Sequence, residues 1–196
     1  MNARALAVVG IAVTPLLALA ALPVLPDRPP LAHTGGFGER TCQECHTDNP
    51  LNDPAGQLEL IGMPEAYQPR RHYSLVIRLI RKDLGRAGFE MATRVAQGGL
   101  TGHQSGKLES TDARVNIADS TRSDFGPVQY ARHTREGSSV ASDTTQWTVQ
   151  WTAPGPRMGA VMLNLVANAG NDDNSPLGDY IYSKTVTSRP SEPARR

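Results

Sequence analysis

The sequence predicts a mainly β protein built as an immunoglobulin-like antiparallel β-sandwich. Short runs in which apolar and polar residues alternate recur from residue 67 onward, and this period of two is typical of strands with one buried face. Turn-forming Gly, Pro, Asn and Asp residues separate the runs. About 175 residues follow an apolar N-terminal segment, which is enough for one domain with its own hydrophobic core.

Residues 1–26 have the features of an export segment. Arg4 supplies a short positive region, residues 5–25 carry no charge, and residues 18–20 (Ala-Leu-Ala) offer a cleavage site for a signal peptidase. The uncharged run is also long enough to span a bilayer as an uncleaved helix. We therefore expect a signal peptide or a helical anchor in the inner membrane, with the rest of the chain in the periplasm or at the cell surface.

A Pro-rich linker over residues 27–38 leads to the only two cysteines of the chain. Cys42 and Cys45 are separated by two residues and followed at once by His46, which is the CxxCH spacing of haem c attachment. Two thiols add to the two vinyl groups of one porphyrin, and the adjacent imidazole reaches the iron as its proximal ligand. The motif predicts one covalent haem c bound by these three residues.

Three other roles compete for the cysteine pair. A structural zinc site requires four ligands, but the chain has no second cysteine pair. A thioredoxin-like redox pair would lie in a βαβ unit, whereas the residues around Cys42 form loops. A disulfide across so short a loop would be strained. Covalent haem remains the leading prediction, with these three alternatives left open.

His133 is the first candidate for the sixth position of the iron, because a second imidazole suits a low-spin haem. Its parity is opposite to that of Val128 and Tyr130, so it should point away from the apolar face of its strand. A haem covering the outside of one sheet could meet it there. A solvated surface histidine is the simpler alternative.

Two methionines are alternative sixth ligands. Met63 is followed by a proline, an arrangement that resembles the methionine loops of soluble cytochromes c. Met91 shares a face with Phe89 and fits the core better than a haem site. The remaining histidines complete the set of candidates: His33, His72 and His103.

The strand predictions follow the alternating runs at residues 73–79, 89–95, 147–151, 161–167 and 180–182. Trp147 and Trp151 share one parity, so we expect them in the core and not in an electron relay. The Ser/Thr/Gly-rich stretches 98–127 and 135–145 are expected to be long loops. The haem loop and sandwich then span residues 39–186, and residues 187–196 form a disordered tail.

Charge and polar clusters suggest weaker sites. Residues 168–174 are rich in Asn and Asp, which could bind calcium, but they lack EF-hand spacing and suit an ordinary turn. Seven basic residues between 70 and 94 could dock an acidic redox partner, bind haem propionates, or simply keep a strand edge soluble. Without residues 1–21 the chain has 19 basic and 19 acidic residues, which argues against binding to nucleic acid.

Several blocks occur in a characteristic order: Phe37-Gly38, the CxxCH motif, Tyr67-Gln68-Pro69, Gly88-Phe89-Glu90-Met91, Tyr130-Ala131-Arg132-His133-Thr134, Trp151-Thr152-Ala153-Pro154 and Gly178-Asp179-Tyr180-Ile181-Tyr182. This order resembles the choice-of-anchor V family of bacterial envelope proteins. The resemblance implies a Reeler-like β-sandwich outside the cytoplasm, preceded by a CxxCH segment. Family members commonly carry a C-terminal anchor that residues 190–196 do not offer, which favours residues 5–25 as a retained anchor over a cleaved signal peptide.

These features predict a mono-haem c-type cytochrome that carries single electrons and is not an enzyme. Two protein ligands would saturate the iron, and no acid–base pair is evident beside the motif. Its partner would be a redox protein or a membrane electron-transfer complex. The alternatives are a surface interaction or adhesion module in which haem is structural, and a haem enzyme or gas sensor with an open sixth position.

Overall fold

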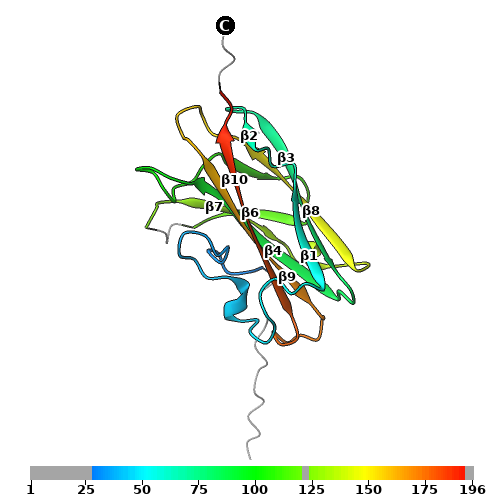
Figure 1. The fold of residues 1–196 in the computed structure, drawn as a ribbon. Helices are drawn as coiled ribbons and strands as arrows, with labels where there is room; N and C mark the ends of the chain where they lie inside the picture. Colours follow the sequence, from blue (N-terminus) through cyan, green and yellow to red (C-terminus); the bar gives the residue numbers. More distant parts are fainter. Residues whose placement is uncertain (1–27, 121–123, 193–196) are drawn as a thin grey trace, which may run out of the picture.

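Two β-sheets pack face to face in the computed structural model, which describes residues 28–120 and 124–192 (Figure 1). One sheet contains, in spatial order, β1 (Gly56–Ile61), β3 (His72–Arg81), β8 (Thr144–Thr152) and β5 (Lys107–Ser110). The other contains β2 (Ala66–Tyr67), β10 (Tyr180–Pro190), β9 (Val161–Gly170), β4 (Arg86–Val95), β7 (Val128–His133) and β6 (Val115–Ser120). Two short 3-10 helices, η1 (Cys42–Glu44) and η2 (Glu136–Ser138), lie outside the sheets. The predicted mainly β sandwich is confirmed.

The core lies between the sheets and is built by the alternation seen in the sequence. Trp147, Val149 and Trp151 of β8 face inward and are almost fully buried. They meet inward residues of the other sheet, where the rings of Phe89 and Trp147 lie 4.8 Å apart. The predicted core role of both tryptophans is confirmed. Replacing such a side chain by alanine typically costs about 3–5 kcal/mol.

Three segments differ from the prediction. The stretch expected to be a long loop at residues 98–127 contains β5 and β6, both short, polar strands at sheet edges, where burial imposes little alternation. The loop expected after the CxxCH motif ends in β1. The disordered tail was expected to begin at residue 187, but β10 continues to Pro190 and Arg189 pairs with Ala66. Residues 193–196 lie outside the described residues.

Residues 28–50, here called the strap, cross the outer face of the six-stranded sheet (Figure 1, blue). The side chain of Glu90 in β4 accepts hydrogen bonds from the amides of Ala32 and His33, at 2.9 and 3.3 Å. Arg94, four residues further along β4 and on the same face, forms an ion pair with Glu39. The region predicted as an extended linker is therefore packed on the sheet over its described part.

The predicted export segment, residues 1–26, lies outside the described residues. Within residues 28–120 and 124–192, no helix has the length and apolar character needed to cross a bilayer.

Candidate functional site

The CxxCH motif forms one tight turn in the strap. The side chain of Thr41 accepts a hydrogen bond from the amide of Gln43 and thereby caps η1. The amides of Cys45 and His46 both donate to the carbonyl of Cys42, at 3.2 and 3.1 Å. Because η1 packs against β9, the turn presents two thiols and an imidazole at the outer face of the six-stranded sheet.

Both cysteines are free thiols, with Cys45 exposed and Cys42 partly buried. Burial, followed by the nearby Glu90 carboxylate, raises the pKa of Cys42 to about 12. The Cys42 thiol is therefore protonated at neutral pH, whereas the reactive cysteine of a thioredoxin-like pair has a lowered pKa. This finding argues against the redox-pair alternative.

The zinc alternative also lacks support. Among residues 28–120 and 124–192, the structure places no three His, Cys, Asp or Glu side chains where they could share a metal ion. A structural zinc site requires four such ligands. A haem requires only one or two from the protein, so this finding does not test the haem prediction.

His46 is oriented by a buried carboxylate. Its Nδ1 lies 2.7 Å from Oδ2 of Asp179, a side chain that is only 6 % exposed. Because a carboxylate only accepts hydrogen bonds, this contact places the imidazole proton on Nδ1 and leaves the lone pair on Nε2. The amide Nδ2 of Asn168 lies 3.4 Å from Nδ1 and 3.5 Å from Nε2, both at the limit of a hydrogen bond, so the shorter contact with Asp179 decides the tautomer. Nε2 is thus the nitrogen left for a metal.

Hydrogen bonds join the segment after the motif to the loop that leads into β10. The amide of Gly178 donates to Asp48 Oδ2 at 2.6 Å, and Asn49 Nδ2 donates to the carbonyl of Asp179 at 2.9 Å. The amide of Asn52 donates to the carbonyl of Ile181, also at 2.9 Å. These bonds keep His46 and Asp179 in register although they are far apart in the sequence.

His133 sits where β7 separates from β4. The two strands pair only at Glu90 with Arg132 and at Met91 with Ala131. Beyond this point His133 Nδ1 lies 3.0 Å from the amide nitrogen of Phe89 and 3.3 Å from its carbonyl oxygen. Accepting from the amide places the ring proton on Nε2, whereas donating to the carbonyl places it on Nδ1. The ring is half-buried, and this burial lowers the pKa of His133 below its ordinary value, which favours the neutral imidazole. His133 is therefore not the solvated surface histidine of the simpler alternative.

Gly88 brings the two histidines to the same part of the sheet. In β4 the even-numbered residues point outward, and a methyl group on Gly88 would lie 2.7 Å from Nδ1 and 3.0 Å from Nε2 of His133. Gly88 is the direct partner of Asn168 in β9, whose side chain reaches His46. Opposed Cβ positions in such a pair lie about 5 Å apart. His133 and the side chain of Asn168, which contacts His46, thus lie over paired positions of β4 and β9 on the outer face.

The reason predicted for His133 was wrong. Val128 and Tyr130 do not face the sandwich core, because they form an outer cluster with Ala92 beneath the strap. His133 shares its parity with Ala131, which lies in the core. Its ring nevertheless lies over Gly88 on the outer face, at the point where the pairing of β7 with β4 ends while β7 stays paired with β6.

The structure does not bring the methionine candidates near His46. Met63 packs on the core beside β2, which pairs with the end of β10 opposite to Asp179. Met91 is fully buried between the sheets. The other histidines have partners of their own: His33 pairs with Glu44 at 3.3 Å, His72 bonds Thr152 at 2.9 Å, and His103 lies against the ring of Phe125.

Two residues of the site were missed by the sequence reasoning, Asp179 and Asn168. Asn168 belongs to the stretch considered for calcium, but its amide donates to Asp179 at 2.9 Å. The next side chains, Asn171 and Asp173, accept backbone amides within their own loop, as turn residues do. The signal for Asp179 was its place in the Gly-Asp-Tyr-Ile-Tyr block, which carried no assigned role.

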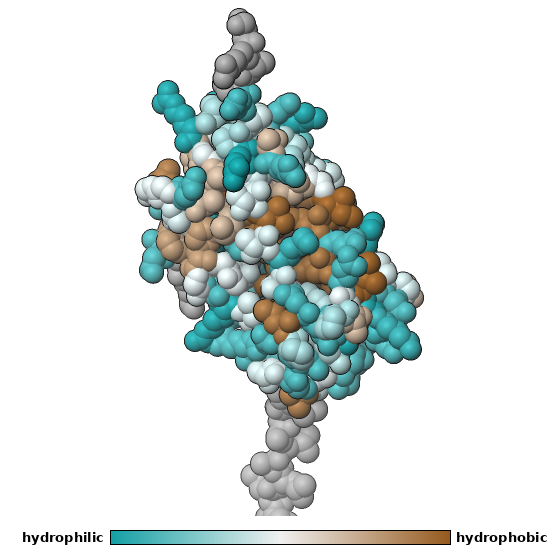
Figure 2. Space-filling model, in the orientation of Figure 1, coloured by the Kyte–Doolittle hydropathy of each residue, from teal (hydrophilic) through white to brown (hydrophobic). Residues whose placement is uncertain are grey.

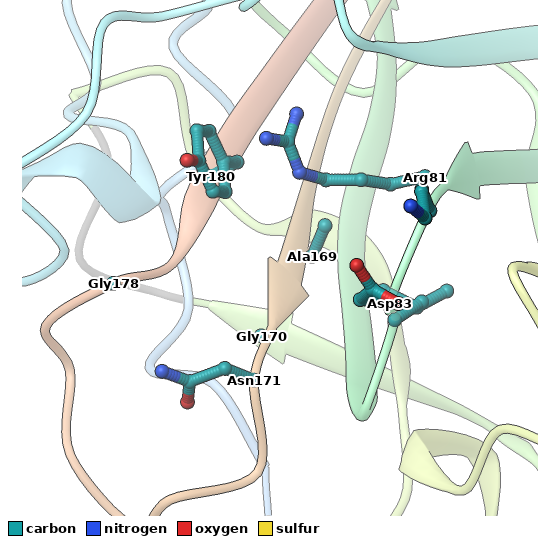
Figure 3. A pocket seen from close by; sticks show the side chains of 9 residues that line it. Arg81, Asp83, Ala169, Gly170, Asn171, Gly178 and Tyr180 are labelled. Carbon is teal, nitrogen blue, oxygen red and sulfur yellow. The ribbon is translucent and has the colours of Figure 1, made fainter.

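A small pocket opens at the end of the sandwich beside this loop (Figure 3). Arg81 extends across it, with its guanidinium 3.2 Å from the centre of the Tyr180 ring. The same guanidinium binds Asp53 and the hydroxyl of Tyr182, at 2.9 and 2.6 Å. The basic group in the pocket, the guanidinium of Arg81, is therefore already paired with side chains of the protein itself.

The basic residues between 70 and 94 do not form one face. Four of the seven have carboxylate partners, and these pairs are spread over both sheets: Arg78 with Glu59, Arg81 with Asp53, Arg86 with Asp172, and Arg94 with Glu39. This arrangement gives no support to a single docking surface for an acidic partner.

The residues of the turn fit a haem c by the chemistry of their donor set. Two unpaired thiols lie on one turn with an imidazole whose Nε2 is left for a metal. A second imidazole, that of His133, lies over Gly88 on the same face.

No family model matches this chain, and no curated protein matches it either. Among solved structures, it is similar to a human F-spondin reeler domain, at 17% identity and a TM-score of 0.43 over 69% of this chain and 89% of that one. The Reelin-N domain of F-spondin gives 16% identity and a TM-score of 0.44, covering 77% and 96%. The macrocyclization enzyme AvmM of alchivemycin A biosynthesis gives 12% and 0.43, covering 74% and 93%.

These TM-scores lie below 0.5, so the similarities carry no argument about function. The β-sandwich is established by the strands themselves, and the choice-of-anchor V family remains a resemblance.

Proposed function

We propose that this chain is an exported mono-haem c-type protein that carries single electrons. The observation that carries the proposal is the CxxCH turn, in which a buried carboxylate holds His46 by Nδ1 and leaves Nε2 for the iron. Cys42 and Cys45 would tether the haem covalently, and His46 and His133 would hold its iron. When bound, the haem supplies a one-electron couple.

The chain's own residues favour electron transfer over substrate chemistry. If the imidazoles of His46 and His133 both bound the iron, no ligand position would remain open for a substrate. His46 is held at Nδ1 by Asp179. His133 Nδ1 lies beside both the amide and the carbonyl of Phe89, and only a bond donated to the carbonyl would leave Nε2 free for the iron. A fixed ligand pair changes little between oxidation states. The partner would be a redox protein or a membrane electron-transfer complex, reached from the periplasm or through residues 5–25 as an anchor.

The strap itself argues against a haem that serves only as a staple. Glu90 already binds the amides of Ala32 and His33, and Arg94 already binds Glu39. These contacts hold the strap on the sheet through the protein's own side chains. A haem bound to the strap is thus available for a redox role.

Covalent attachment is the decisive test. We expect full-length protein produced with cytochrome c maturation factors to show a c-type pyridine haemochrome spectrum and an intact mass increased by one haem. The double variant C42A/C45A, made in the same way, should show neither. If the wild-type protein has only the mass of its amino acids, the proposal is overturned.

A second measurement tests the sixth ligand. We expect His133→Ala to convert a low-spin spectrum into a high-spin one and to allow carbon monoxide to bind the reduced protein. His72→Ala, which changes an exposed histidine on the other sheet, is the matched control and should leave the spectrum unchanged. An unchanged spectrum in His133→Ala would remove His133 from the proposed ligand pair.

One observation favours a second candidate, a surface interaction module. In Figure 2, apolar residues reach the surface over the middle of the molecule, between the strap and the four-stranded sheet. Ile61 of β1 is one apolar residue that is 42 % exposed. Exposed apolar surface is typical of protein contacts. A protein that takes up no haem, yet loses self-association or partner binding when Ile61 is changed to Lys, would favour this candidate.

A further inference from the structure

Asp179 is buried more deeply than a carboxylate in a connecting loop needs to be. It accepts hydrogen bonds from three donors: Nδ1 of His46 at 2.7 Å, Nδ2 of Asn168 at 2.9 Å and the amide of Asn171 at 3.3 Å. A charged group removed from water is destabilising unless such partners compensate it. The surrounding backbone leaves room for it, because a methyl group on Gly170 would lie 3.2 Å from Asp179 Oδ1.

The carboxylate of Asp48 shows that the segment after the CxxCH motif can be joined to the loop before β10 without a buried charge. Asp48 is exposed, and it binds the amide of Gly178 at 2.6 Å, next to Asp179 in the sequence. It links the same two segments without touching His46 and without the cost of burial. Asp179 is instead buried against the imidazole of His46. This indicates that it acts on the histidine and does more than join the two loops.

We propose that Asp179 is the positioning residue of His46, which fixes its proton on Nδ1, directs Nε2 toward the metal and lowers the reduction potential of the bound iron. A carboxylate that accepts the Nδ1 proton makes the imidazole a stronger electron donor at Nε2. A stronger donor stabilises the oxidised metal more than the reduced metal. The statement about the potential rests on the proposed function, whereas the statement about the proton does not.

Asn168 weakens the effect of the Asp179 carboxylate on His46. Its Nδ2 donates to Oδ2 of Asp179, the oxygen that also binds His46. This bond draws negative charge away from the imidazole. Removing the Asn168 amide should therefore strengthen the contact between Asp179 and His46, whereas removing the Asp179 charge should weaken it.

The test on haem-loaded, full-length protein measures reduction potentials. We expect Asp179→Asn to raise the potential by an amount that corresponds to a roughly tenfold change in the oxidised-to-reduced affinity ratio, which is about 59 mV for one electron. Asn168→Ala should shift the potential the other way. Asp48→Asn, which removes the same charge from the same pair of loops, should match wild type. Equal potentials in Asp179→Asn and wild type would overturn the inference while leaving the proposed function intact.

A measurement on full-length protein made without maturation factors separates the two proposals. Nitrogen-15 spectra of the histidine rings should show the Nδ1–H tautomer of His46 in wild type and in Asp48→Asn. Asp179→Ala should show mainly the Nε2–H tautomer. If wild type carries its proton on Nε2, or if Asp179→Ala leaves the tautomer unchanged, Asp179 does not position His46. This holds whether or not the protein takes up haem.

Discussion

The outer face of each sheet is formed by every second residue of its strands, but one outer face is covered by the strap and the other is open to solvent. On β4 the outward residues include Glu90 and Arg94, and both are almost completely buried because the strap covers them. On β8 the outward residues Thr144 and Gln146 remain exposed. The covered face is thus a second, polar core. Buried charged side chains on an outward face can therefore mark the place where another segment of the chain, here the strap with the candidate site, is fixed.

The largest expected difference between the faces concerns their ion pairs. Glu39→Ala would leave Arg94 buried with its charge unpaired, which typically costs about 3–5 kcal/mol. Glu59→Ala breaks the pair with Arg78 on the open face, where both side chains are partly exposed, and should cost about 0–1 kcal/mol. Urea unfolding of the two variants measures both values. Equal losses would contradict the view that the strap forms a second core.

The pH dependence of stability should come from the covered face. Burial raises the pKa of Glu90 from its ordinary value of 4.5 to about 7. Between these values the folded state binds the proton that the unfolded state releases, so stability is complete below pH 4.5 and falls as the pH rises to 7. The raised pKa corresponds to a loss of about 3 kcal/mol.

Urea unfolding between pH 4 and 8 measures this loss, and Glu90→Gln should remove most of it. The matched control is Glu59→Gln on the open face, which should keep the wild-type slope. A wild-type protein whose stability rises over this range would show that the carboxyl of Glu90 is not neutral in the folded state.

The smallest effect concerns the space beside His133. Gly88→Ala would push a methyl group into the imidazole ring, and overpacking of this kind typically costs about 1–3 kcal/mol. Thr148→Ala, at an outward position of β8, should change the free energy of unfolding by no more than about 0.5 kcal/mol. Thermal unfolding compares the two. If Gly88→Ala proves neutral, the ring does not occupy the outer side of β4.

Local patterns predicted the inner core well. In β8, Trp147, Val149 and Trp151 alternate with polar residues, and the structure places all three inward. In β9, Leu163 and Leu165 follow the same rule. The edge strands β5 and β6 were not found, because each has too few buried residues to show a period. The alternation of apolar and polar residues can be recognised in a sequence only where a strand is buried on one face along most of its length.

The alternating strands and the turn that holds Cys42, Cys45 and His46 together could be predicted from the sequence, since both depend on residues close along the chain. The orientation of His46 by Asp179, the space that Gly88 leaves for His133 and the burial of Glu90 under the strap are visible only in the folded protein. These contacts join residues that are tens to more than a hundred positions apart. No local period encodes them, because they arise only when the strap and the ends of β4, β7, β9 and β10 meet on one face of the sheet.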